Sequence, residues 1–214
     1  MLYLIIADQT DAYVRQIKES AQQQAQVMAL QLRPHFIYNV LTSIYYLCEQ
    51  DPARAQQVTL DFTNYLRANY DAVAQEGDVP FSKELEHTRA YLAVEQARLE
   101  DRLVVDFDCT HTAFRLPPLT LQPLVENAVK HGADPELPPL HVRITTRKES
   151  DFSEITVEDT GPGFDGATSE DHTPGALDNI RERLAARGAT FDVYPREGGG
   201  TKAVIRVPNR DETD

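Results

Sequence analysis

The sequence has few cysteines, no tryptophan and no long hydrophobic run. Cys48 and Cys109 are its two cysteines, far apart and without a CxxC spacing, so we expect a reduced compartment and no structural zinc site. No stretch approaches the roughly 20 apolar residues of a membrane span. The short apolar run at residues 2–7 lacks the basic flank of a signal peptide. That run is either the stub of a removed membrane helix or a helix start in a cut chain.

Basic residues are also scarce. The 214 residues include 21 Lys and Arg against 34 Asp and Glu, a formal net charge of −13. An acidic surface repels phosphate backbones, which argues against nucleic acid as a partner. A nucleotide triphosphate would need local neutralisation by a metal ion, by a few cations or by helix N-termini. Hydrophobic residues make up 41% of the chain, enough for a core.

The first half of the sequence is typical of helices. Residues 10–30 lack Gly and Pro and carry a narrow seam at three- or four-residue spacing, typical of a short coiled coil or of one exposed helix. Pro34 interrupts this pattern. Two helical runs follow, at 36–48 and 53–73, and the second puts an apolar face together (Val58, Phe62, Tyr65 and Leu66). A lone hairpin cannot bury such a face, so we expect a dimer with a four-helix bundle.

The pattern changes after a linker at residues 75–78. Ser82 is placed to N-cap a helix that carries Glu84 and Glu86 in its first turn. Strands are expected at 103–107, 141–147, 154–158, 191–194 and 203–207, and helices at 119–130, ended by Gly132, and at 177–186. This mixture predicts an α+β protein in which a helical hairpin precedes an α/β sandwich, one sheet covered by helices.

The segment around His35 is the first candidate for chemistry. Pro34 opens the helix directly before His35, which leaves room for a large donor. A neutral imidazole with a pKa near 6.5 is a competent nitrogen nucleophile. The ordinary alternative is a structural or merely exposed histidine.

The second candidate is the helix at 121–132. Asn127 shares a helical face with Lys130 and His131, because residues three and four apart are neighbours. An amide oxygen suits Mg²⁺, and Lys or His meets phosphate oxygens. Glu126 lies one step round and is placed to orient a metal-bound water. An ordinary amphipathic helix would explain the charges but not their combination.

Two glycine strings complete the set. Asp159 ends an expected strand, where its carboxylate can accept a hydrogen bond from an exocyclic amine such as that of adenine. Gly161 and Gly163 follow, and glycines let a backbone approach a ligand. Residues 198–200 form a run of three glycines before Thr201. Each string alone is also typical of an ordinary turn.

The four motifs, in this order, resemble the LytS/YehU-type sensor histidine kinases, whose ATP-binding domain belongs to the GHKL (Bergerat) superfamily of gyrase, Hsp90, histidine kinases and MutL. Pro34-His35-Phe36-x-x-Asn39 resembles the phosphoacceptor box and residues 117–132 the N box. Residues 79–85 and 91–98 resemble the inter-domain and first-helix signature. Residues 159–163 resemble the first glycine box, 177–184 the helix after the ATP lid and 198–201 the last glycine box.

The resemblance implies roles for these residues and a division of the chain. His35 would attack the γ-phosphorus of ATP, Asn127 would hold Mg²⁺, Lys130 and His131 would lie by the phosphates, and Asp159 would bind adenine. Gly161 and Gly163 would hinge the lid, and Leu177, Asn179, Gly200 and Thr201 would complete the nucleotide site. The expected parts are a signalling helix (1–30), phosphoacceptor and dimerisation helices (31–77), a catalytic domain (78–208) and an acidic tail (209–214).

The resemblance further implies a cytoplasmic homodimer, anchored to a membrane upstream of this chain, that passes its phosphoryl group to an aspartate of a response regulator. Two departures favour other interpretations. Pro174-Gly175-Ala176-Leu177 replaces a Gly-x-Gly-Leu string, and residues 164–180 contain no Lys or Arg. We therefore expect weak ATP affinity with strong Mg²⁺ dependence. The alternatives are a nucleotide-gated interaction or phosphatase module, and an ATP hydrolase with Glu126 as its water base.

Overall fold

The computed structural model describes residues 34–73, 77–133, 136–163 and 176–209. The expected signalling helix at 1–30, the lid residues 164–175 and the tail beyond Asn209 lie outside the described residues, as does the side chain of His35. Among the described helices, none combines the length and hydropathy that a bilayer span requires.

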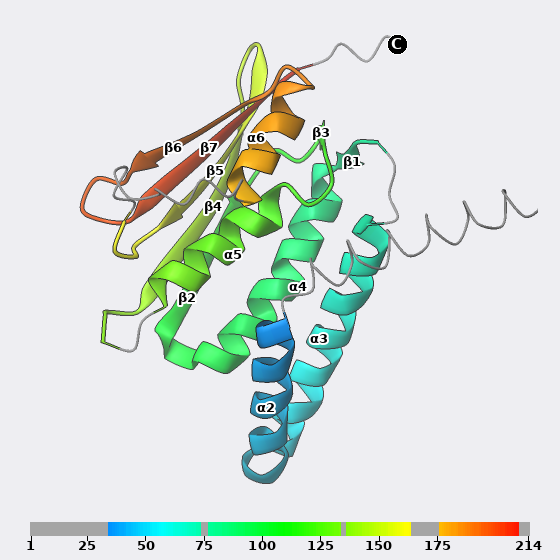
Figure 1. Ribbon diagram of the computed structural model, residues 1–214, viewed down its shortest axis with the longest axis vertical. Coiled ribbons are helices and arrows are strands. Elements are labelled where there is room, and N and C mark those ends of the chain that lie inside the picture. Colours follow the sequence, from blue (N-terminus) through cyan, green and yellow to red (C-terminus); the bar gives the residue numbers. More distant parts are fainter. Residues whose placement is uncertain (1–33, 74–76, 134–135, 164–175, 210–214) are drawn as a thin grey trace, which may run out of the picture.

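The first described residues form the predicted helical hairpin (Figure 1). Helix α2 spans Pro34–Gln50 and α3 spans Pro52–Val73. Each starts with a proline, whose missing N–H costs nothing in the first turn. Asp51 makes the turn between them, and its Oδ1 accepts the Arg54 N–H at 3.0 Å. The two predicted helices are thereby confirmed within about two residues at each end.

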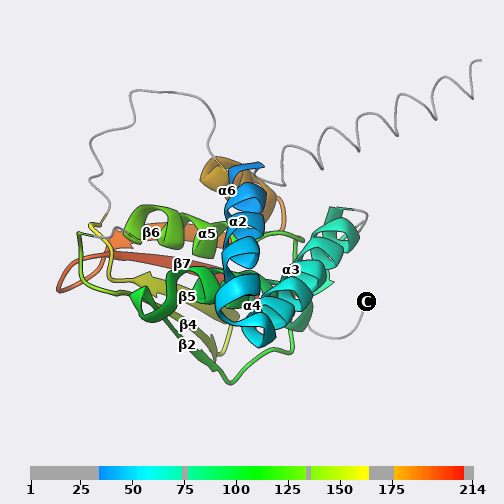
Figure 2. The same cartoon turned by 90° about the horizontal axis from the view of Figure 1, so that it is seen from below.

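The hairpin packs on α4 (Phe81–Leu99) through aromatic side chains. The ring of Phe36, from α2, lies 5.1 Å from that of Tyr65 on α3 and 5.4 Å from that of Tyr91 on α4. Phe62 completes the group. Figure 2 shows α2 and α3 beside α4, away from the sheet. The apolar face of α3 is therefore buried within the chain itself, against α2 and α4, and not by a second copy as the sequence predicted.

Helix α4 does not begin as predicted. Its N-cap is Pro80, with no side-chain capping bond, and Ser82 lies exposed inside the first turn. The strand pair β1 (Val79–Pro80) and β3 (Arg115–Leu116), which was not predicted, sets the entry of the helix instead. The Phe81 N–H donates to the Phe114 carbonyl at 2.9 Å beside this pair. A long-range backbone pairing thus replaces the local serine cap.

The central sheet has five strands in the order β2-β4-β5-β7-β6. They are β2 (Leu103–Cys109), β4 (Leu140–Lys148), β5 (Phe152–Asp159), β6 (Thr190–Pro195) and β7 (Thr201–Pro208). The pair β2–β4 is parallel and the other pairs are antiparallel. A parallel pair needs a crossover, which α5 (Leu121–Gly132) supplies between these two strands. A short 3-10 helix (Glu100–Arg102) joins α4 to β2.

Helices α4, α5 and α6 (Ala176–Ala185) cover one face of the sheet (Figure 1). Ile144, Ile155 and Ile205 point into this layer and are at most 1% exposed. On the other face, cross-strand ion pairs join β4 to β2 and β7 to β5, including Arg206–Glu154 at 2.9 Å and Lys202–Glu158 at 3.3 Å. One apolar and one charged face are typical of a sheet that is covered on one side. The predicted α+β architecture is confirmed.

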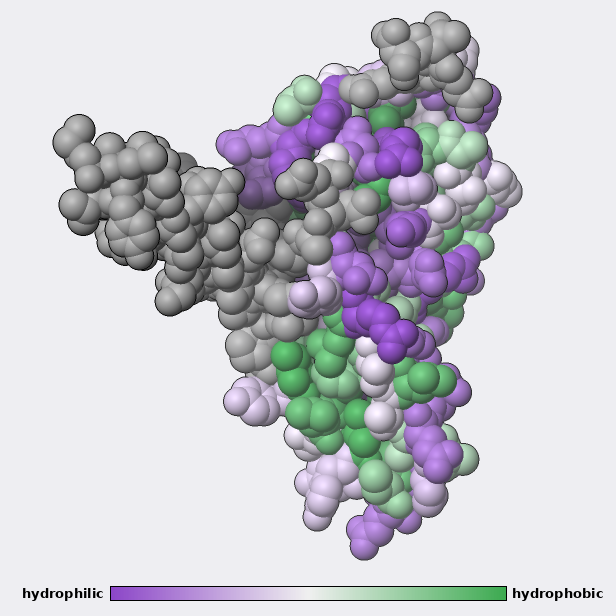
Figure 3. Space-filling model, turned by 90° about the vertical axis from the view of Figure 1, so that its right-hand side faces the viewer, coloured by the Kyte–Doolittle hydropathy of each residue, from purple (hydrophilic) through white to green (hydrophobic). Residues whose placement is uncertain are grey.

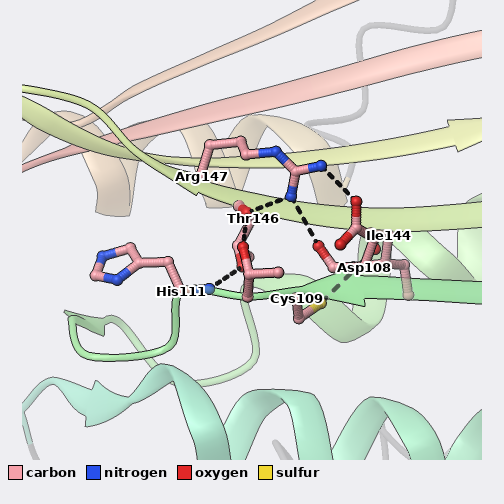
Figure 4. Close-up of polar contacts among 7 residues, drawn as sticks. Asp108, Cys109, His111, Ile144, Thr146 and Arg147 are labelled. Carbon is pink, nitrogen blue, oxygen red and sulfur yellow. Dashed lines mark hydrogen bonds and ion pairs between the residues drawn. The ribbon is translucent and has the colours of Figure 1, made fainter.

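The end of β2 is fastened to β4 by polar contacts (Figure 4). The Arg147 guanidinium donates to the Asp108 carbonyl at 3.1 Å and pairs with the Asp108 carboxylate, which lowers the pKa of Asp108. The His111 N–H donates to Thr146 Oγ1 at 3.2 Å. Cys109, a free cysteine like Cys48, donates its thiol to the Ile144 carbonyl. These contacts fix the start of the loop that leads to α5.

Helix α5 differs from its prediction at its start. It begins at Leu121 rather than at residue 119, because Leu119 has a positive φ of 55°. Gly132 ends the helix as predicted: it is the last helical residue, without a positive φ, and Ala133 is the C-cap. A Cβ atom at residue 132 would overlap the side chain of Leu140. Gly132 therefore serves close packing between α5 and β4.

A candidate nucleotide cleft

A cleft opens between α5 and the strands β5, β6 and β7. Its polar lining comes from Asn127 of the candidate N box, Asp159 of the first glycine string and Thr201 after the last one. The remaining walls are apolar and come from α5, α6 and the sheet (Leu124, Ala128, Val157, Leu177, Phe191, Val193 and Ala203). Motifs that lie far apart in sequence therefore meet in one place, as the order of the motifs predicted.

Asp159 is the charged group of this cleft. It is 8% exposed. Its Oδ1 accepts the Gly161 N–H at 2.8 Å and the Thr201 N–H at 3.3 Å. Burial raises the pKa of Asp159, and these two hydrogen bonds oppose the rise. Because both N–H groups converge on Oδ1, the carboxylate is held in one orientation at the end of β5.

Gly161 and Gly200 make close approaches around Asp159, and Gly163 lies in ordinary contact beside them. A Cβ on Gly161 would lie 2.9 Å from the Gly132 Cα atom, which places the first glycine string directly against the end of α5. A Cβ on Gly200 would overlap the Asp159 carbonyl, and Gly200 has a φ of 98°. A Cβ on Gly163 would lie 3.5 Å from the Gly200 carbonyl oxygen. Side chains at residues 161 and 200 would push these three segments apart.

The N-terminus of α5 is capped from another helix. The carboxylate of Glu84, on α4, accepts the N–H groups of Leu119, Thr120 and Leu121 at 2.7, 2.8 and 3.0 Å. Burial raises the pKa of Glu84, and the three N–H donors oppose the rise. Arg183, on α6, donates to the Leu119 carbonyl at 2.9 Å. Two charged side chains thereby orient the helix that presents Asn127.

Glu126 faces away from the cleft, toward the hairpin. It is 7% exposed and is not among the residues that line the cleft. Gln122, one turn earlier, donates Nε2 to Glu126 Oε1 at 2.5 Å and to the Tyr65 hydroxyl at 3.3 Å. The carboxylate is therefore buried on the side of α5 that meets α3.

Four other predicted site residues are not among those that line the cleft. Lys130 and His131 are exposed in the last turn of α5, and Asn179 is exposed on α6. His35 is the second residue of α2. Among the described residues, no group of three or more His, Cys, Asp or Glu side chains is placed to hold a metal ion.

Sequence reasoning missed three residues that shape this site. Glu84 was expected only to favour the dipole of its own helix, and Arg183 only as part of a motif. Their partners lie 35 and more residues away in sequence, so no local signal points to them. Gln122 did carry a signal, because its spacing of four from Glu126 puts both side chains on one helical face.

The chemistry of the cleft fits a purine nucleotide. Apolar walls suit the faces of a base, and a buried carboxylate acceptor suits an exocyclic amine. Asn127 offers an amide oxygen, a ligand type that Mg²⁺ accepts, at the edge of the same cleft. A mixed sheet with helices on one face and this cleft define a nucleotide-binding domain preceded by a helical hairpin.

The comparison with protein families agrees. Residues 23–103 match the histidine kinase family model, and residues 118–211 match that of the histidine kinase-, DNA gyrase B- and HSP90-like ATPases. The two matches together span most of the chain. The chain belongs to the histidine kinase family.

The curated relatives that the chain matches are longer proteins. YwpD of Bacillus subtilis is 40% identical over 72% of this chain and 58% of its own length. The sensor histidine kinase YesM of Bacillus subtilis is 33% identical over 92% of this chain and 34% of its own length. The sensor protein LytS of Enterococcus faecalis is 28% identical, over 97% and 38%. The chain thus spans between about a third and three fifths of the relatives it matches.

Solved structures share the fold at low identity. The histidine kinase domain of a blue-light-activated histidine kinase from Erythrobacter litoralis is 18% identical, with a TM-score of 0.51 over 89% of this chain and 95% of that one. The catalytic domain of histidine kinase ThkA is 14% identical, with a TM-score of 0.51 over 63% and 98%. These likenesses establish the arrangement of helices and sheet.

Proposed function

We propose that this chain is the catalytic core of a sensor histidine kinase, which transfers the γ-phosphoryl group of ATP to His35. A lone pair of the imidazole forms a bond to the γ-phosphorus while the bond to the β–γ bridging oxygen breaks and ADP leaves. Catalysis of this kind rests mainly on positioning and charge neutralisation. The observation that carries the proposal is the single cleft lined by Asn127, Asp159 and Thr201.

Each residue around the cleft has a role in this proposal. The Asp159 carboxylate accepts a hydrogen bond from the exocyclic amine of adenine, and the N–H groups of Gly161 and Thr201 hold that carboxylate in place. Leu177 packs on the base, and Asn179 lies nearby on α6. Gly161, Gly163 and Gly200 allow the backbone to approach the nucleotide. Lys130 and His131, exposed at the end of α5, meet the phosphates.

In this proposal the Asn127 amide oxygen would hold Mg²⁺, which when bound would neutralise charge beside the nucleotide. The donor set fits this role, since Asn127 lines the cleft and the whole chain carries a formal net charge of −13. A cation brought with the ligand offsets the repulsion between an acidic protein and a triphosphate.

The hairpin supports a homodimer. Tyr38, Leu41 and Tyr45 follow each other at three- and four-residue spacing on α2 and are 70%, 50% and 75% exposed. Figure 3 shows hydrophobic side chains gathered over the hairpin half of one face, below a mostly hydrophilic upper half. We propose that a second copy covers this stripe and forms a four-helix bundle.

The wider setting follows the relatives. In this proposal residues 31–77 form the phosphoacceptor and dimerisation part and residues 78–208 the catalytic domain. The core works in the cytoplasm, as part of a protein anchored to the membrane. It passes the phosphoryl group from His35 to an aspartate of a response regulator.

Incubation with γ-labelled ATP tests the function. The wild type, His35→Ala, Asn127→Ala and Glu126→Ala are compared for bound label and for released phosphate. We expect an acid-labile, base-stable label that is lost in His35→Ala and reduced at least tenfold in Asn127→Ala.

The alternatives give different results in the same experiment. An ATP hydrolase would release phosphate that only Glu126→Ala abolishes, with no label on His35. The position of Glu126, outside the cleft walls and against α3, does not favour that outcome. A nucleotide-gated interaction module would bind ATP and show neither label nor release.

A further inference from the structure

A series of hydrogen bonds connects the hairpin to the helix that carries Asn127. The Tyr65 hydroxyl of α3 accepts Gln122 Nε2 at 3.3 Å, and the same Nε2 donates to Glu126 Oε1 at 2.5 Å. Tyr65, Gln122 and Glu126 are 2%, 3% and 7% exposed. These contacts therefore lie within the interface between the two candidate functional parts of the chain.

Close packing alone does not require these polar contacts. A leucine at residue 122 and a phenylalanine at residue 65 would fill similar space without burying the amide and the hydroxyl. Gln122 Oε1 is buried and has no hydrogen-bond partner among the described residues, which costs free energy. These polar side chains make the interface less stable than an apolar one of the same shape. What their hydrogen bonds add is a fixed relative position of α3 and α5.

The same aromatic cluster holds the start of α2. Phe36, the residue after His35, is 8% exposed and packs its ring edge-on against Tyr65 at 5.1 Å. The ring of Tyr65 thus packs against the residue next to His35, and the hydroxyl of Tyr65 accepts a hydrogen bond from Gln122 in the first turn of α5. Asn127, which lines the cleft, directly follows Glu126.

We propose that Tyr65 and Gln122 are positioning residues for phosphoryl transfer. Through them the packing of α2 and α3 is set relative to α5, so that the helix carrying His35 and the helix presenting Asn127 keep one relative orientation. Neither residue touches the nucleotide in this proposal, which rests on the kinase function proposed above. Their loss should slow transfer without weakening nucleotide binding.

The test uses Tyr65→Phe, which keeps the ring and removes the hydroxyl. We expect the single-turnover rate of His35 labelling, at saturating ATP and Mg²⁺, to fall about tenfold, while the affinity for a fluorescent ATP analogue changes less than twofold. Tyr91→Phe is the matched control. It removes a hydroxyl from the same cluster, but one that donates to Glu95 on its own helix at 3.4 Å. Its rate should stay within twofold of the wild type.

Gln122→Leu supplies a second, independent variant. It should slow labelling at least as much as Tyr65→Phe, because it removes the bond to Glu126 as well as the bond to Tyr65. The loss in the double variant should be smaller than the product of the two single losses, because both variants remove the Tyr65–Gln122 bond. Thermal unfolding of every variant reports whether the fold is retained.

Three results would overturn the proposal. They are a Tyr65→Phe rate equal to or above that of the wild type, an equal loss in Tyr91→Phe, or losses that multiply in the double variant. A wild type that labels His35 while Tyr65→Phe labels it equally fast refutes the positioning role alone. A wild type that never labels His35 refutes the kinase function, and the positioning role with it.

Discussion

Gly200 lies so close to Asp159 that a Cβ atom on residue 200 would come within 2.8 Å of the Asp159 carbonyl carbon. The turn that contains Gly200 therefore packs directly against the segment that begins at Asp159 and contains Gly161. Gly200→Ala should lose at least tenfold in ATP affinity and also stability, because its φ of 98° strains alanine by about 1–2 kcal/mol before the clash is counted. Gly198→Ala is the control, since its φ is 86° but its Cβ would meet no atom within 4 Å. Equal losses in both variants would contradict the close approach.

Glu84→Gln should destabilise the protein by about 1.5–3 kcal/mol, because hydrogen bonds from N–H groups to a charged acceptor are strong. Urea unfolding measures this. Glu86→Gln, two residues along on the exposed side of α4, should change the free energy of unfolding by about 0.5 kcal/mol or less. Glu84→Gln should also weaken nucleotide binding, since Glu84 caps the helix that carries Asn127. Unchanged stability would exclude Glu84 as a significant cap.

His87 should make stability depend on pH. It is buried beside Tyr65 with ring centroids 5.8 Å apart, and burial lowers the pKa of His87 to about 4 from 6.5. The unfolded chain then binds more protons between these values, so this contribution is present above pH 6.5 and is lost as pH falls toward 4. From it alone, the free energy of unfolding should be about 2 kcal/mol smaller at pH 5 than at pH 7.

His87→Phe isolates that contribution, because the other titratable groups are common to both proteins. Urea unfolding of both at pH 7 and pH 5 gives the difference of differences. A pH dependence identical in the two proteins would contradict a buried neutral His87.

Chelation of Mg²⁺ should weaken the binding of an ATP analogue more than tenfold. No Lys or Arg occurs at residues 164–180, and the chain is acidic overall, so the metal must carry much of the neutralisation. In Asn127→Ala the effect of chelation should shrink several-fold. Asn209→Ala, at an exposed residue directly after β7, should respond like the wild type. Tight binding without metal would contradict the prediction.

Leu41→Glu should convert the proposed dimer into a monomer, because a charge in the stripe of Tyr38, Leu41 and Tyr45 would be buried in the bundle. Sedimentation velocity measures the mass. Tyr194→Glu is the control, since Tyr194 is 45% exposed and belongs to strand β6 of the sheet, not to the hairpin. A monomeric wild type would contradict the dimer.

The motifs are recognisable in the sequence because their chemistry is local. The helices at 34–50 and 52–73 follow from prolines and apolar spacing, and the strands from alternation. The order of His35, Asn127, Asp159 and Gly200 along the chain is enough to carry the resemblance to the family. The meeting of Asn127 with Asp159 in one cleft is implied by that resemblance, and the fold establishes it.

Other features belong to the tertiary structure alone. The cap of Glu84 on α5, the parallel pairing of β2 with β4, and the bond from Tyr65 to Gln122 all join residues 35 or more positions apart. Ser82 shows the reverse error, since it fits a local capping rule that a long-range pairing overrides. Spacing and propensity determine which elements form and which side of each is apolar. Which buried polar groups then meet depends on how the chain closes in space, and a local pattern does not encode it.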